Sequence, residues 1–99
     1  MAVRIIAIKA LKEFWEKHSD AEQPLRAWYA EAKNADWKKP ADITKLYRSA
    51  SILTNDRVVF NIKGNDYRLV AAINYEFKII YVRFIGTHKE YDKINAKEI

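Results

Sequence analysis

Apolar and polar residues alternate almost without interruption in the second half of the chain, from Arg57 onwards. Successive side chains of a β-strand point to opposite faces of its sheet, so a period of two predicts strands. The alternation predicts three strands, over residues 57–63, 67–74 and 79–86. Gly64-Asn65 is a two-residue hairpin signal, because both residue types tolerate a positive φ, and residues 75–78 supply a second turn. The pattern therefore predicts an antiparallel meander.

The turns also predict a register for this meander. A two-residue first turn places Asn61 beside Arg68, and the second hairpin places Arg83 opposite Val70. One sheet face then collects a basic set with no carboxylate: Arg57, Asn61, Lys63, Arg68, Tyr81 and Arg83. The other face collects the apolar set Val58, Phe60, Ile62, Tyr67, Leu69, Ala71, Ile73, Ile80, Val82 and Phe84.

The first half of the chain has the period of a helix. Apolar residues recur at helical spacing from Ile8 to Trp15, which predicts an amphipathic helix that ends near His18. Asp20 is the predicted N-cap of a second helix, because Gln23 follows three residues later and Pro24 lies in the first turn. The apolar positions of this second helix are Ala21, Leu25, Trp28 and Ala32. A short third helix is predicted from Pro40 to Tyr47.

The segment Thr87-His-Lys-Glu90 is a capping box directly after the last strand, and it predicts a short C-terminal helix. We therefore predict an α+β fold, with N-terminal helices on one face of a twisted, mainly antiparallel sheet and residues 3–6 as an added edge strand. The 99 residues fit a single domain over residues 1–99.

Composition narrows the chemistry. The net charge of +5 favours polyanionic partners such as nucleic acid. The chain contains no cysteine, which excludes disulfides, thiolate metal sites and a cysteine nucleophile. The two histidines, His18 and His88, are far apart in the sequence, so we expect no metal site and no cofactor. The apolar run Ile5–Ile8 is too short for a signal peptide or a membrane span, so we expect a cytoplasmic protein without membrane contact.

Five segments of the chain resemble the HigB toxins, the mRNA interferases of the wider RelE group in type II toxin–antitoxin modules. They are Leu11–His18, Pro24–Tyr29, Arg57–Ile62, Gly64–Leu69 and Gly86–Asp92. The resemblance implies a RelE-like toxin domain with endoribonuclease activity that cleaves mRNA, often on the ribosome. It also implies neutralisation by a helix-turn-helix antitoxin similar to HigA.

The resemblance assigns roles to individual residues. Arg68, in Tyr67-Arg68-Leu69, matches an arginine that the group places on the strand after its central hairpin. His88 and Tyr91 match an imidazole or basic group and a tyrosine that follow the last strand. The group often has paired lysines before the hairpin; here Lys63 and Asn61 stand there, so the identity of the general base stays open.

RNA cleavage by attack of the 2′-OH on the adjacent phosphate requires a proton acceptor, a proton donor and stabilisation of charge on phosphorus, but no metal. Arginine suits phosphate because its guanidinium binds two oxygens in a fixed fork. Histidine is the one side chain that titrates near neutral pH. The candidate catalytic residues are Arg68, Arg83, His88 and Tyr91, and the candidate RNA-binding residues are Arg57, Asn61, Lys63 and Lys89.

Some of these side chains could instead serve the fold. Arg57 could pair with Asp56 or with a chain terminus, Lys63 could pair with Asp66, and Tyr91 could belong to the core. Two alternative functions also remain: an RNA-binding module without catalysis, and an interaction subunit whose basic face docks an acidic partner.

Overall fold

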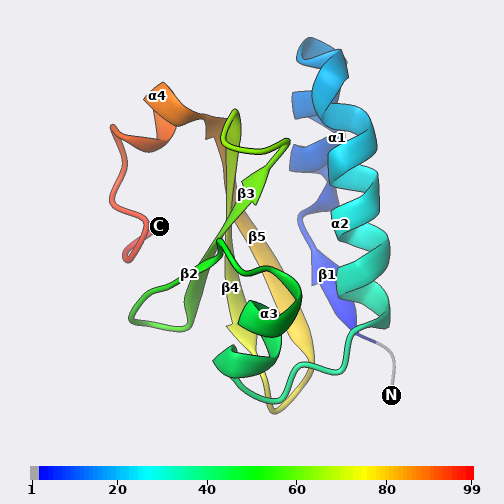
Figure 1. Ribbon diagram of the computed structural model, residues 1–99, viewed down its shortest axis with the longest axis vertical. Coiled ribbons are helices and arrows are strands. Elements are labelled where there is room, and N and C mark those ends of the chain that lie inside the picture. The colour runs from blue at the N-terminus through cyan, green and yellow to red at the C-terminus, as the bar shows by residue number, and fades with distance from the viewer. Residues whose placement is uncertain (1–2) are drawn as a thin grey trace.

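Five strands form one mixed sheet in the order β1-β5-β4-β3-β2 (Figure 1). The computed structural model describes residues 3–99. The strands are β1 (Arg4–Ile6), β2 (Ser51–Ile52), β3 (Arg57–Ile62), β4 (Tyr67–Asn74) and β5 (Ile79–Thr87). β1 lies parallel to β5, and the other neighbours are antiparallel. The predicted meander and the added N-terminal edge strand are thus confirmed.

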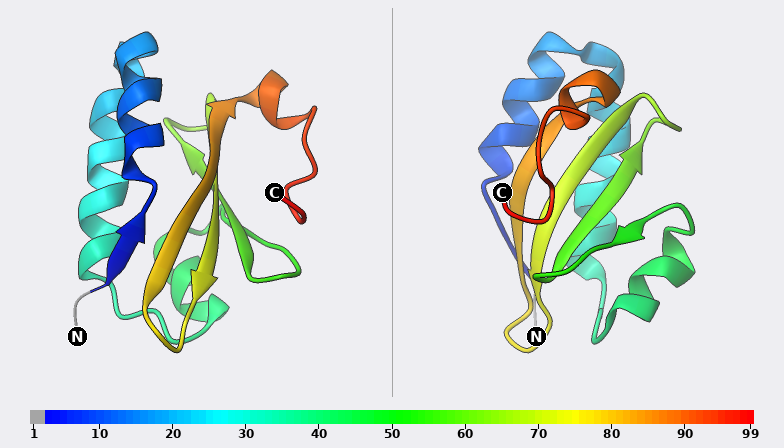
Figure 2. Two further views of the ribbon diagram at one scale, coloured as in Figure 1. Left: turned by 180° about the vertical axis from the view of Figure 1, so that it is seen from behind. Right: turned by 90° about the vertical axis from the view of Figure 1, so that its left-hand side faces the viewer.

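Helices flank this sheet on both sides. They are α1 (Ile8–Lys17), the 3₁₀ turn η1 (Ser19–Ala21), α2 (Glu22–Asn34), α3 (Pro40–Leu46) and α4 (His88–Tyr91). Figures 1 and 2 show α1 and α2 on one side of the sheet, and α4 with the C-terminal residues on the other. This is the predicted α+β architecture.

The main core lies between the helices and the sheet. Leu11 of α1 and Leu25 of α2 are fully buried, and the ring of Trp28 packs edge-on against Phe60 of β3 at 5.5 Å between centroids. Each helix therefore buries the apolar stripe that its sequence period predicts. α3 adds the fully buried Ile43 to the same core.

The start of α2 differs from the prediction. Its N-cap is Ala21, which has no capping side chain, and Asp20 lies in η1 instead. The Asp20 carboxylate accepts hydrogen bonds from Lys63 Nζ at 2.6 Å and from Tyr67 Oη at 2.5 Å. The prediction failed because a charge-assisted tertiary contact replaces the local capping hydrogen bond.

The central hairpin has the predicted register but a different turn. Asn61 pairs with Arg68, and Ile62 with Tyr67. The turn spans residues 63–66, and its positive φ angles are 52° at Lys63 and 64° at Gly64. The left-handed residues are therefore one position earlier than Gly64-Asn65.

A β-bulge in β5 corrects the prediction for Arg83. Val70 pairs with Phe84 and Ala71 pairs with Val82, so Arg83 is an extra residue in β5. One extra residue reverses the alternation for the positions that follow it. Phe84 consequently joins the face predicted to be basic, and Arg83 does not lie opposite Val70.

A second apolar cluster covers the middle of the face that we predicted to be basic. Buried Val59 and Val70 form its floor, and Phe84 packs beside them. Residues 92–99, the C-terminal strap, lie over this floor and contribute buried Ala96 together with Ile94 and Ile99 (Figure 2). The polar residues of this face are therefore left around the strap, not in one continuous basic surface.

Gly86 makes the junction between β5 and α4 possible. A Cβ atom at this position would lie 2.6 Å from Cζ of Phe84 and 2.9 Å from Oε1 of Glu90. Other contacts hold both of these side chains in place, because Phe84 packs in the second cluster and Glu90 completes the capping box. Glycine is the residue that lets the ring and the carboxylate approach the strand this closely.

Candidate functional site

Arg68 and Asn61 lie side by side on the sheet face away from α1 and α2, as predicted. Both side chains are half-buried. Nδ2 of Asn61 donates to the carbonyl oxygen of Ser49 at 3.3 Å. Nη1 of Arg68 donates to the carbonyl oxygens of Asn65 at 2.9 Å and Tyr67 at 3.3 Å. Only Nη1 of Arg68 has protein partners in the described residues, so the rest of its donor fork is available to a ligand.

The sheet brings Arg68 to the beginning of α4. Arg68 pairs with Gly86 across the β4–β5 ladder, and Tyr67 pairs with Thr87. The predicted capping box is formed, since Oγ1 of Thr87 accepts from the amide of Glu90 at 3.2 Å and Oε1 of Glu90 accepts from the amide of Thr87 at 2.8 Å. The amide of Thr87 lowers the pKa of the Glu90 carboxyl. His88 therefore starts a fixed turn two residues beyond the partner of Arg68.

His88 has a carboxylate neighbour that sequence reasoning missed. Its Nδ1 lies 3.4 Å from Oδ2 of Asp92, and the side chain is 55% exposed. The two residues are four positions apart, and that spacing brings side chains together at a helical turn. This spacing was the available signal for Asp92. A carboxylate at Nδ1 orients an imidazole and leaves Nε2 free to exchange a proton.

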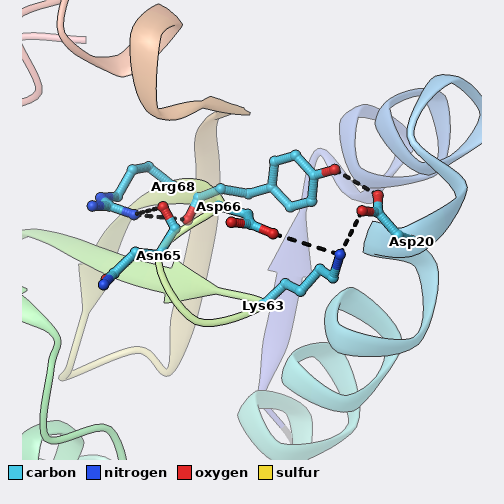
Figure 3. A network of polar contacts seen from close by, with 6 residues as sticks. Asp20, Lys63, Asn65, Asp66 and Arg68 are labelled. Atoms are coloured by element: carbon cyan, nitrogen blue, oxygen red, sulfur yellow. Dashed lines mark hydrogen bonds and ion pairs between the residues drawn. The ribbon is translucent and has the colours of Figure 1, made fainter.

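Besides Asn61, two more of the predicted RNA-binding residues are engaged by protein groups. Arg57 donates from Nε to the carbonyl oxygen of Ile99 at 2.7 Å and from Nη1 to that of Asn55 at 2.8 Å. The alternative that Arg57 pairs with the end of the chain is thus observed. Lys63 binds Asp20, and lies 3.5 Å from Asp66, as the alternative for this residue predicted (Figure 3). Lys89 is exposed at the surface of α4.

Arg83 lies in a separate hollow of about 390 Å³ between α1, β5 and α4. The residues that line it with Arg83 include Lys17, His18 and Glu90, but not His88. His18 is half-buried there, stacked on Phe14 at 4.3 Å between ring centroids. Arg83 therefore lines a hollow to which His88 does not contribute, although both are candidate catalytic residues.

Tyr91 is half-buried at the edge of the second apolar cluster, with its ring 6.5 Å from that of Phe84 between centroids. This is the core position that we considered as the alternative for Tyr91. Within residues 3–99, no group of three histidine, aspartate or glutamate side chains is placed to share a metal ion. No helix in this described range is long and apolar enough to cross a membrane.

Known proteins resemble the chain over most of its length. Residues 21–94 match the HigB toxin family, described as the RelE-like toxic component of a toxin–antitoxin system. The mRNA interferase toxin HigB of Escherichia coli strain K12 is 32% identical over 96 residues, which cover 95% of this chain and 92% of that protein. The mRNA interferase HigB of E. coli O6:H1 is 27% identical over 94 residues, which cover 93% of this chain and 91% of that protein.

Proposed function

From the premise that this chain belongs to the HigB family of RelE-like toxins in toxin–antitoxin systems, we propose that it is an endoribonuclease that cleaves mRNA. Its relatives are named mRNA interferases. The observation that carries the proposal is the pairing of Arg68 with Gly86, which brings a phosphate-binding side chain to the turn that begins with His88. We place the activity in the cytoplasm and on the ribosome, because mRNA is bound there during translation. The antitoxin is another chain, similar to HigA.

In the proposed reaction the 2′-oxygen of a nucleotide attacks the adjacent phosphorus, and the bond from phosphorus to the 5′-oxygen breaks. The proton of the 2′-OH goes to a general base, and the leaving 5′-oxygen takes a proton from a general acid. Arg68 binds the phosphate oxygens and stabilises the charge that grows on them. His88 exchanges one of the two protons, with Asp92 holding its imidazole.

We assign no residue to the second of these two proton transfers. Tyr91 is near His88 in the sequence, but its ring packs on Phe84. Arg83 and Lys89 are assigned to contacts with flanking phosphates. Arg57 and Asn61 join them where RNA displaces or extends their present hydrogen bonds, and Lys63 contributes its charge while it stays paired with Asp20. We keep Tyr91 as a positioning group for the ribose.

Induced expression of the chain alone should arrest growth and truncate cellular mRNAs. The arrest follows because loss of message stops protein synthesis. Growth curves and mapping of mRNA ends after induction measure both effects. The matched control is the His88→Gln variant expressed to the same level, which should permit growth. Normal growth with abundant full-length protein would reject the toxin assignment.

RNA cleavage should continue in excess EDTA, because this mechanism draws its nucleophile from the RNA and its charge stabilisation from arginine. The products should carry a 2′,3′-cyclic phosphate or a 3′-phosphate and a 5′-OH. Because EDTA dissociates ribosomes, this assay uses naked RNA, which the chain should also cleave without a ribosome. End-labelling and mass spectrometry identify the termini. A 5′-phosphate would show that an activated water attacks the phosphorus and would overturn this mechanism.

A further inference from the structure

The Asp20 carboxylate connects the helical layer to both ends of the turn in the central hairpin. Oδ2 accepts from Nζ of Lys63 at 2.6 Å, and Oδ1 accepts from Oη of Tyr67 at 2.5 Å (Figure 3). Lys63 is the first residue of the turn, and Tyr67 is the first residue of the strand after it. One carboxylate from η1 thus holds the two ends of the turn at once.

The conformation of this turn sets the position of Arg68. Nη1 of Arg68 donates to the carbonyl oxygens of Asn65 at 2.9 Å and Tyr67 at 3.3 Å, both within the segment that Asp20 clamps. Two consecutive residues of the turn, Lys63 and Gly64, have φ angles of 52° and 64°. A lysine rarely adopts the left-handed region without a contact that holds it there. The ion pair with Asp20 is such a contact.

The Lys63–Asp20 ion pair is exposed, so it can position the turn without contributing much to the stability of the fold. The side chains of Lys63 and Asp20 are 43% and 48% exposed. Ion pairs this exposed contribute little to the free energy of unfolding. Tyr67 is 8% exposed, and its packing against Phe14 does not require the hydroxyl group. Loss of the Asp20 charge should therefore loosen the turn and leave the core intact.

We propose that Asp20 is a positioning residue for RNA cleavage, acting through the turn of residues 63–66 to hold the guanidinium of Arg68 in place. The inference rests on the proposed function, in which Arg68 binds the scissile phosphate. It adds a residue of the helical layer, outside the sheet face that carries Arg68, to the determinants of the reaction.

The chain offers a matched control for this proposal. Asp36, in the loop after α2, and Lys78 form a carboxylate–lysine pair at 2.5 Å that joins this loop to a hairpin turn. Lys78 too has a positive φ, of 57°. That turn joins β4 to β5 at the end of the ladder away from the Arg68–Gly86 pair. Asp36→Asn therefore removes the same kind of contact without touching the turn that holds Arg68.

Asp20→Asn should lower the single-turnover rate of RNA cleavage at saturating RNA by roughly ten- to a hundredfold, since misplacing a catalytic group by about 1 Å can cost about a hundredfold. Asp36→Asn should stay within a few-fold of wild type. The two variants should have similar thermal unfolding temperatures. In an Arg68→Ala background, Asp20→Asn should cause no further loss, because the residue acts through Arg68.

Three results would overturn either this inference or the proposed function on which it rests. A full additional loss in the Arg68→Ala background would show that Asp20 acts independently of Arg68. An Asp20→Asn rate equal to wild type, with Arg68→Ala inactive, would reject positioning while leaving the proposed function intact. Failure of wild type to cleave any RNA would reject the proposed function instead. In that case, NMR order parameters for residues 63–68 still decide the structural claim, since Asp20→Asn should lower them and Asp36→Asn should not.

Discussion

Arg68→Ala should lower the rate of RNA cleavage by about a hundredfold or more, the usual loss when one donor that stabilises transition-state charge is removed. This factor corresponds to about 2.7 kcal/mol of transition-state free energy. The reason is geometric: Arg68 is half-buried beside Asn61, with one nitrogen tied to the turn and the rest of its fork free. Single-turnover assays at saturating RNA give the rate.

The fold should survive this change. Arg68 lies on the face away from the main core, and its hydrogen bonds to residues 3–99 reach only backbone carbonyls of its own hairpin. Arg68→Lys is the matched variant, because it keeps the charge and removes the fork; it should recover binding but little of the rate. Unchanged far-ultraviolet circular dichroism with activity within a few-fold of wild type would show that Arg68 does not bind the scissile phosphate.

The elements of this fold could be predicted because local pattern and global packing agree. The alternation in β3 and β4 gives the pairing of Asn61 with Arg68, and the helical stripes of α1 and α2 give the residues that cover the sheet. Thr87 and Glu90 form their capping box because both partners lie within one turn of chain. Information of this kind is local, and local preference is what a single sequence records most directly.

The site was harder to predict than the elements, because tertiary contacts determine the positions of the residues that we misplaced. The sequence alternates through Arg83 and Phe84 without a break, yet a bulge in the ladder leaves Arg83 unpaired and moves Phe84 to the other face. Residues 92–99 contain three apolar residues separated by polar ones, and nothing in this pattern indicated that Ile94 and Ala96 would cover the basic face. Asp20 resembles a cap in sequence, but a lysine more than forty residues later competes for its carboxylate.

The strap also changes how RNA must approach. It covers Val59, Val70 and Phe84 in the middle of the sheet face, so the exposed donors of this face lie at the strap's margins. Arg57 is tied to the far end of the strap through the carbonyl oxygen of Ile99. Arg68 and His88 share the other margin, near the β4–β5 ladder and α4. The proposed reaction centre is therefore at the α4 end of the face, not along its whole length.

His88→Gln should retain RNA binding and lose most of the chemical step. Glutamine keeps a polar side chain of similar reach, but it cannot exchange a proton near neutral pH, and general acid–base catalysis of one step contributes about a hundred- to ten-thousandfold. The fold should not change, because the side chain is exposed and the capping box uses Thr87 and Glu90. Equilibrium binding to RNA and single-turnover cleavage separate the two effects.

Asp92→Asn provides the test of the neighbouring carboxylate. It removes the charge 3.4 Å from Nδ1 of His88 while keeping the size of the side chain. If Asp92 orients the imidazole, Asp92→Asn by itself should lower the cleavage rate. It should add little to the loss caused by His88→Gln, since both residues act on the same proton transfer.

A His88→Gln protein that binds RNA weakly yet cleaves bound RNA at the wild-type rate would make His88 a contact residue. Proton transfer would then have to come from Tyr91, Lys63 or Lys89.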